Sequence, residues 1–259
     1  MTVPPWKRLF PTQPFNAELF TGNTDAFEQA ICDTIARVTD VRAPRESFQI
    51  ETTDQHQIEE MASIAVALSF LTWLIGLIGA RRVLEIGTFV GVSAMYFSRA
   101  LPAGGKVVTL EKFNTFAQLA RRNIAANGLS QSIEVLEGDA IEVLPTLVNE
   151  EPFDFVFIDG NKERYAQYVD LTTPLVREGG ILAVDDAFFH GDALNLSHKT
   201  EKGLGVRACL DSVTKMKDWN RALLPISNGL LLMTKARSAV LPNTASPEIQ
   251  KGQNSRALG

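Results

Sequence analysis

Short apolar runs alternate with helical stretches through the middle of the chain. Five runs are rich in Val, Ile and Leu, as expected of strands buried on both faces: 81–87, 106–111, 133–139, 153–159 and 180–186. Between them lie stretches with helical patterning, such as VSAMYFSRAL and TFAQLARRNIAANGL. Alternation of strand and helix predicts an α/β fold, a parallel doubly wound sheet with helices on both faces.

The last two apolar runs follow a different pattern. In NRALLPISNGLLLMTK, Asn228 and Gly229 lie between the two runs. Asn-Gly between apolar runs is a strong short-range signal for a β-hairpin. The sheet is therefore predicted to finish with an antiparallel hairpin at its C-terminal end.

The pattern also divides the chain into three parts. Residues 1–48 hold an irregular start and one predicted helix that begins at Thr24, and they are interpreted as an N-terminal helical extension. Residues 49–236 are predicted to form the main domain. Residues 237–259 lose the apolar periodicity and become rich in small and polar residues, which predicts a disordered tail.

One segment is apolar enough to be considered as a membrane-spanning helix. Residues 61–80 carry no charge and are long enough to cross a bilayer. Serine, threonine and glycine dilute their hydrophobicity, and Arg81 and Arg82 follow at once, which suits the negative end of a helix dipole. A helix buried on most sides and packed on the sheet, with Trp73 in the core, is the favoured interpretation. A membrane-tethered binding protein remains an alternative.

Charge and cysteine content narrow the class of partner. The chain has 259 residues, 45% of them hydrophobic, and a net charge of −5, with no basic run. A nucleic-acid partner or an anionic membrane is therefore disfavoured, and a small molecule is expected. Cys32 and Cys209 are far apart and lack metal-ligand spacing, which suits a cytoplasmic protein.

The ends of the predicted strands carry a consistent chemistry. In an open parallel sheet, ligands bind outside the carboxyl ends of the strands. Nearly every such end carries a glycine or an acid: Gly87, Glu111, Asp139, Asp159 and the pair Asp185 and Asp186. Two adjacent carboxylates after an apolar strand repel each other and lose hydration, so a bound partner must stabilise them.

The turn EIGTFVGVS narrows the class of expected ligand further. Gly87 and Gly91 allow close backbone approach before a helix, but the spacing is not that of a dinucleotide fingerprint. Glu111 follows Gly91 by 20 positions and can accept both hydroxyls of a ribose. Together they indicate a nucleoside ligand without a pyrophosphate. A nucleotide-cofactor-dependent dehydrogenase on a similar sheet remains an alternative, which the turn disfavours.

Six motifs in order resemble one enzyme family. The stretches VLEIGTFVGVSA, VVTLE, EGDA, FDFVFIDGNKERY, GGILAVDD and LLPISNGLLLMTK are similar to cation-dependent O-methyltransferases of the caffeoyl-coenzyme A and catechol type. The resemblance implies a Rossmann-like, seven-stranded sheet, S-adenosylmethionine as methyl donor, a phenolic or catechol-like acceptor and a homodimer. It also implies a divalent cation, usually Mg²⁺, with Ca²⁺ or Mn²⁺ possible.

The resemblance assigns roles to particular residues. The implied cofactor-binding residues are Met61, Glu85, Gly87, Ser93, Glu111, Asp139, Ala140 and Asp159. The implied metal ligands are Asp159, Asp185 and Asp186, the first two separated by 26 positions as in the plant members. Lys162 stands at the position of the general base, where its pKa would need to fall, as a nearby cation can cause.

Two positions depart from the family pattern. Val92 replaces a tyrosine near the cofactor, and Asp186 replaces an asparagine in the metal site. The N-terminal segment and the stretch 187–205 do not match closely, so the resemblance names no particular acceptor.

Overall fold

The structure is a computed structural model, and it describes residues 24–39, 41–53 and 65–236. The predicted tail 237–259, the irregular start and Met61 lie outside the described residues. The remaining positions with an expected role in the site are all described.

The described chain forms a seven-stranded sheet in the order β3-β2-β1-β4-β5-β7-β6. The strands are β1 (Arg82–Ile86), β2 (Lys106–Glu111), β3 (Ile133–Glu137), β4 (Phe153–Ile158), β5 (Val176–Val184), β6 (Trp219–Leu224) and β7 (Leu230–Lys235). The pairs from β3 through β5 are parallel, whereas β7 pairs antiparallel with both β5 and β6. The predicted sheet with its C-terminal antiparallel pair is confirmed.

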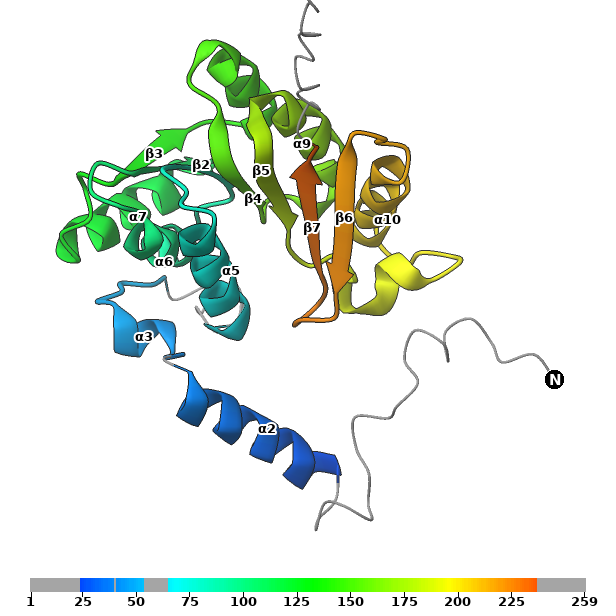
Figure 1. Cartoon of the computed structure of the whole chain (residues 1–259), viewed down its shortest axis with the longest axis horizontal. Helices are drawn as coiled ribbons and strands as arrows, with labels where there is room; N and C mark the ends of the chain where they lie inside the picture. Colours follow the sequence, from blue (N-terminus) through cyan, green and yellow to red (C-terminus); the bar gives the residue numbers. More distant parts are fainter. Residues whose placement is uncertain (1–23, 40, 54–64, 237–259) are drawn as a thin grey trace, which may run out of the picture.

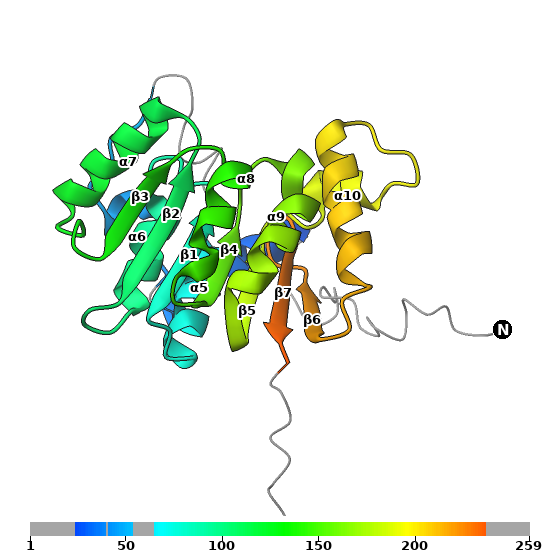
Figure 2. The ribbon, with the colours of Figure 1, turned by 90° about the horizontal axis from the view of Figure 1, so that it is seen from above.

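Helices cover both faces of this sheet (Figures 1 and 2). The helices are α2 (Thr24–Val38), α3 (Pro44–Ser47), α5 (Ala65–Leu77), α6 (Val92–Ala100), α7 (Asn114–Ala126), α8 (Ala140–Val143), α9 (Tyr165–Thr172) and α10 (Glu201–Val213). Helices α5, α6 and α7 pack on one face, where Phe155 and Phe157 of β4 are buried. Helices α8, α9 and α10 pack on the other, against Val156 and Ile158. This burial on both faces explains why β4 is apolar without interruption from Phe155 to Ile158.

Strand β5 and the hairpin connection differ most from the sequence prediction. Strand β5 begins at Val176 rather than near residue 180, because Val176 pairs with Phe153 before a shift in register. The hairpin connection spans residues 225–229 and is longer than a two-residue Asn-Gly turn. Its positive φ angles occur at Ser227 and Gly229, not at Asn228.

Helix α5 is buried on one side only. Leu68, Leu71 and Ile75 pack in the core, but Leu77 is 64% exposed. The expectation that Trp73 lies in the core is wrong, because its side chain is 59% exposed and stacks on Phe70. Among the described residues, no helix combines the length and the apolar character needed to cross a membrane.

Candidate active site

The carboxyl ends of β1 and β4 meet where the strand order reverses, between the halves that run to β3 and to β5. Gly87 follows β1 with φ of 99°. A Cβ atom there would overlap the carbonyl oxygen of Asp159, which follows β4. Only glycine allows this approach, so Gly87 brings the cofactor half of the predicted site against its acidic half.

Glu111, at the end of β2, organises the neighbouring turn. One carboxylate oxygen accepts the backbone N–H of Phe89 at 2.8 Å, and the other accepts that of Phe113 at 3.0 Å. The side chain is buried at the rim. Because Phe89 has a left-handed φ of 50°, its bond to Glu111 also holds the turn after β1 in shape.

Glu85, a buried acid near this rim, has a strongly perturbed pKa. It is fully buried, and burial raises its pKa to about 8, although the hydroxyls of Ser93 and Thr109 favour the charged form. The Thr109 hydroxyl lies 2.5 Å from Oε2 of Glu85, and nearby Asp159 and Glu111 disfavour a further negative charge. Glu85 is therefore neutral near pH 7 in the protein without ligands.

This burial predicts a pH-dependent stability. In the window from about 4.5 to about 8, the folded state keeps a proton on Glu85 that the unfolded state has lost. Stability should therefore fall as pH rises, by up to about 1.4 kcal/mol per pH unit from this group. Glu85→Gln, which stays neutral, should remove that slope in urea unfolding between pH 5.5 and 8. The exposed Glu134→Gln serves as control, and an unaltered slope in Glu85→Gln would contradict the assignment.

Sequence reasoning missed Thr109, the buried partner of Glu85. The register of the sheet places Thr109 beside Glu85 on neighbouring strands. A polar residue inside an otherwise apolar strand was the available signal, since buried polar groups need hydrogen-bond partners.

Asp139 begins α8 beyond the end of β3. Its side chain accepts the backbone N–H of Ile141 at 3.0 Å and pairs with Lys112 at 2.8 Å. The Lys112 bond, with that N–H, lowers the pKa of Asp139. Ala140, the next residue, is buried, and the pairing of Glu111 with Glu137 sets the end of β3, which Asp139 and Ala140 follow, beside the end of β2.

The second half of the rim carries three acids that follow β4 and β5, Asp159, Asp185 and Asp186, which are named the acid cluster below. Lys162 lies between Asp159 and Asp186. Nζ of Lys162 lies 2.5 Å from Oδ1 of Asp159 and 2.8 Å from Oδ2 of Asp186. Asp185 is buried at the end of β5. The structure thus brings Asp159 and Asp186 together around one positive charge.

The pKa of Lys162 moves in the opposite direction to the one a general base needs. Burial alone would lower it, but the charges of Asp159 and Asp186 outweigh burial and raise it well above its usual value. In this form of the protein Lys162 is an ammonium ion. The expected lowering of its pKa therefore requires that another cation first neutralise the carboxylates.

The donor set of the acid cluster fits a hard divalent cation, which prefers carboxylate oxygens. Lys162 already places a positive charge between two of these acids. Across the described residues, no three acidic, histidine or cysteine side chains are arranged as a ready metal site. A divalent ion held by Asp159 and Asp186 would compete with the Lys162 ammonium for their oxygens.

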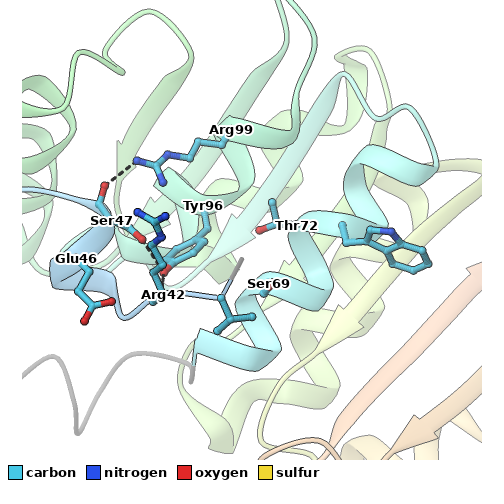
Figure 3. Close-up of a pocket in the computed structure, with 9 residues that line it drawn as sticks. Arg42, Glu46, Ser47, Ser69, Thr72, Tyr96 and Arg99 are labelled. Atoms are coloured by element: carbon cyan, nitrogen blue, oxygen red, sulfur yellow. Dashed lines mark hydrogen bonds between the residues drawn. The ribbon is translucent and has the colours of Figure 1, made fainter. Parts of the chain in front are cut away.

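A cavity of about 480 Å³ lies elsewhere, between α3, α5 and α6 (Figure 3). Tyr96, Arg99, Thr72 and the exposed Trp73 line part of it. The Tyr96 hydroxyl donates to the carbonyl of Arg42 at 2.7 Å, which ties the segment before α3 to α6. The cavity contains none of the acidic residues at the strand ends, so it is separate from the candidate site.

Known proteins share this architecture and sequence pattern. The family model described as O-methyltransferase matches residues 46–236. The chain is 29% identical to "Probable caffeoyl-CoA O-methyltransferase 2" of Dictyostelium discoideum, over 86% of this chain and 97% of that protein. It is 38% identical to a catechol O-methyltransferase of Mycobacterium tuberculosis, over 58% of this chain and 68% of that protein.

A solved structure gives the same result. The O-methyltransferase TomG from Streptomyces achromogenes, in complex with SAM, superposes with a TM-score of 0.65 and 31% identity. The match covers 69% of this chain and 83% of that one. The family match, the seven-stranded sheet and the acidic rim agree, and the chain belongs to the O-methyltransferase family that includes caffeoyl-CoA and catechol O-methyltransferases.

Proposed function

We propose that this protein transfers a methyl group from S-adenosylmethionine to a hydroxyl of a catechol-like or other vicinal-oxygen small molecule, assisted by a divalent cation, with Mg²⁺ as first candidate. The observation that carries the proposal is the acid cluster beside the Gly87 turn, where Asp159 and Asp186 already surround a positive charge. The proposal includes the sequence-based expectations of a cytoplasmic location and a homodimer.

The rim near β1, β2 and β3 suits a nucleoside that carries positive charge. S-adenosylmethionine supplies an activated methyl sulfonium and also bears an ammonium group. Glu85 and Asp159 stand near the Gly87 turn and would face that charge, which would favour ionised Glu85. In this proposal Glu111 would accept the ribose hydroxyls, and Asp139 and Ala140 would contact the adenine.

The acid cluster suits an acceptor with two adjacent oxygens. A bound divalent cation supplies Lewis acidity that lowers the pKa of a hydroxyl. Asp159, Asp185 and Asp186 would hold it, and Lys162, once released from the carboxylates, would take the proton. Phe188 and Phe189, which follow the cluster, are half-buried and provide apolar surface for an aromatic ring.

The assignment of Glu111 to the cofactor gives a measurable expectation. Glu111→Ala removes charge-assisted hydrogen bonds to the ribose, and should cost roughly 1.5 to 3 kcal/mol of S-adenosylmethionine affinity. Isothermal titration calorimetry measures this loss. Glu137→Ala, an exposed acid at the end of the neighbouring strand, is the matched control and should bind normally. Equal affinity of wild type and Glu111→Ala would remove Glu111 from the cofactor site.

A methyl-transfer screen tests the function as a whole. Catechol-like acceptors are incubated with the protein and S-adenosylmethionine, with Mg²⁺ or with EDTA. The expected result is methylation that EDTA suppresses. Titration with NADH discriminates the dehydrogenase alternative, which neither the family match nor the Gly87 turn favours.

A further inference from the structure

The side chain of Asn228 links the acid cluster to the loop that follows it. Its Nδ2 donates to Oδ1 of Asp186 at 3.0 Å, and its Oδ1 accepts the backbone N–H of His190 at 2.6 Å. The two partners define the amide orientation, because a carboxylate can only accept here and an N–H can only donate. Asn228 therefore connects the β6–β7 hairpin with residues 186 and 190.

Main-chain bonds reinforce this connection. The N–H of Phe188 donates to the carbonyl of Asn228 at 2.7 Å, and that of Ala187 to the carbonyl of Gly229 at 2.8 Å. Gly229 has φ of 92°, and a Cβ atom there would lie 2.7 Å from the Phe188 ring. Glycine at this position lets the hairpin lie directly against the loop.

The loop needs such support because its backbone is strained. Asp186, Phe189 and His190 have φ angles of 54°, 43° and 52°, in the left-handed region that non-glycine residues rarely adopt. Conformations of this kind persist only where the surroundings hold them. Asn228 contacts two of the three strained residues through its side chain.

Asn228 also divides the two oxygens of Asp186 between different partners. Oδ1 is held by the amide, and Oδ2 faces Lys162 at 2.8 Å. We propose that Asn228 is a positioning residue that orients the Asp186 carboxylate toward the acid cluster. The inference rests on the proposed function, because the divalent cation would use the oxygen that Asn228 leaves available.

A simple role in the turn does not account for these contacts. Asn228 itself does not have positive φ, unlike its neighbours Ser227 and Gly229. Both polar atoms of its side chain contact the 186–190 loop. The Asn228 side chain therefore bonds to the loop that follows β5, although the residue itself belongs to the hairpin connection.

A double-mutant cycle tests the pairing with Asp186. Asn228→Asp keeps an acceptor for His190 and replaces only the donor toward Asp186, so two carboxylates face each other. In EDTA and without cofactor, we expect Tm to fall by roughly 2 to 4 °C. In the Asp186→Asn background, Asn228→Asp should lower Tm by less than about a third of that amount. There the amide introduced at position 186 can donate to the carboxylate introduced at position 228. Equal losses in both backgrounds would overturn the pairing.

Mg²⁺ titration calorimetry on the cofactor-free protein tests the positioning role. Asn228→Ala should weaken Mg²⁺ binding about tenfold, since an unheld carboxylate must be ordered on binding. Asn220→Ala, an exposed asparagine on the same hairpin, should bind as wild type does. If wild type and Asn228→Ala bind Mg²⁺ equally well, the positioning role of Asn228 is wrong, but the cation of the proposed function stands. If wild type binds no Mg²⁺, the cation of the proposed function fails as well.

Discussion

Asp185→Ala is expected to abolish cation-dependent methyl transfer. Asp185 is buried at the end of β5, and its backbone N–H is held by the carbonyl of Ile158, so its position is set by the sheet. Loss of a cation ligand should remove several kcal/mol of catalytic stabilisation, on the order of 10³-fold in turnover. The measurement is kcat across a Mg²⁺ titration, with S-adenosylmethionine affinity as a check that the fold is intact.

Asp186→Asn is the matched control for this loss. It keeps an oxygen at position 186 and restores the amide that the family pattern has there. Activity should survive, with Mg²⁺ affinity reduced because one negative charge is lost. If Asp185→Ala stays active and EDTA leaves wild-type turnover untouched, the acids do not bind a metal. They would then contact a cationic or hydroxyl-rich substrate directly.

Replacement of Lys162 is expected to have two opposite effects. As general base, Lys162 should contribute about 10² to 10⁴-fold to turnover, so Lys162→Ala should lose that factor while S-adenosylmethionine affinity stays nearly unchanged. The same ammonium pairs with Asp159 and Asp186 at 2.5 and 2.8 Å in the protein without ligands. Its removal should therefore tighten Mg²⁺ binding, because a competing cation is gone.

Stopped-flow or steady-state turnover and Mg²⁺ calorimetry measure these two effects separately. Lys112→Ala is the control, since Lys112 pairs with the single acid Asp139 and is largely exposed. If Lys162→Ala turns over as fast as wild type, Lys162 is not the general base, and the cation alone would account for deprotonation of the acceptor hydroxyl. Unchanged or weaker Mg²⁺ binding would show that the Lys162 ammonium does not compete for the site.

Local patterning was sufficient to predict the sheet and the edge of the sheet that carries the candidate site residues. Continuous apolar runs mark strands that are buried on both faces, and parallel strands align their carboxyl ends at one edge. For this reason Glu111, Asp139 and Asp159 could be assigned to one rim from their positions in the chain. The same patterning located Gly87 in the turn between a strand and a helix.

Local patterning did not predict which face of a helix would be covered. Helix α5 is apolar around most of its circumference, so its sequence gives little information about which side meets the sheet. The packing of α5 against α6 and the sheet left Trp73 exposed. That outcome depends on neighbours distant in sequence, which periodicity does not report.

The tertiary structure alone decided the charge state and the partners of the site. The pKa of Glu85 is raised because the sheet buries it, and that of Lys162 because folding brings two carboxylates to one ammonium. Asn228 meets Asp186 only because β7 returns antiparallel beside β5. Residue types and strand ends are local properties of a sequence, whereas desolvation and long-range pairing arise only when the folded chain brings separated segments into contact.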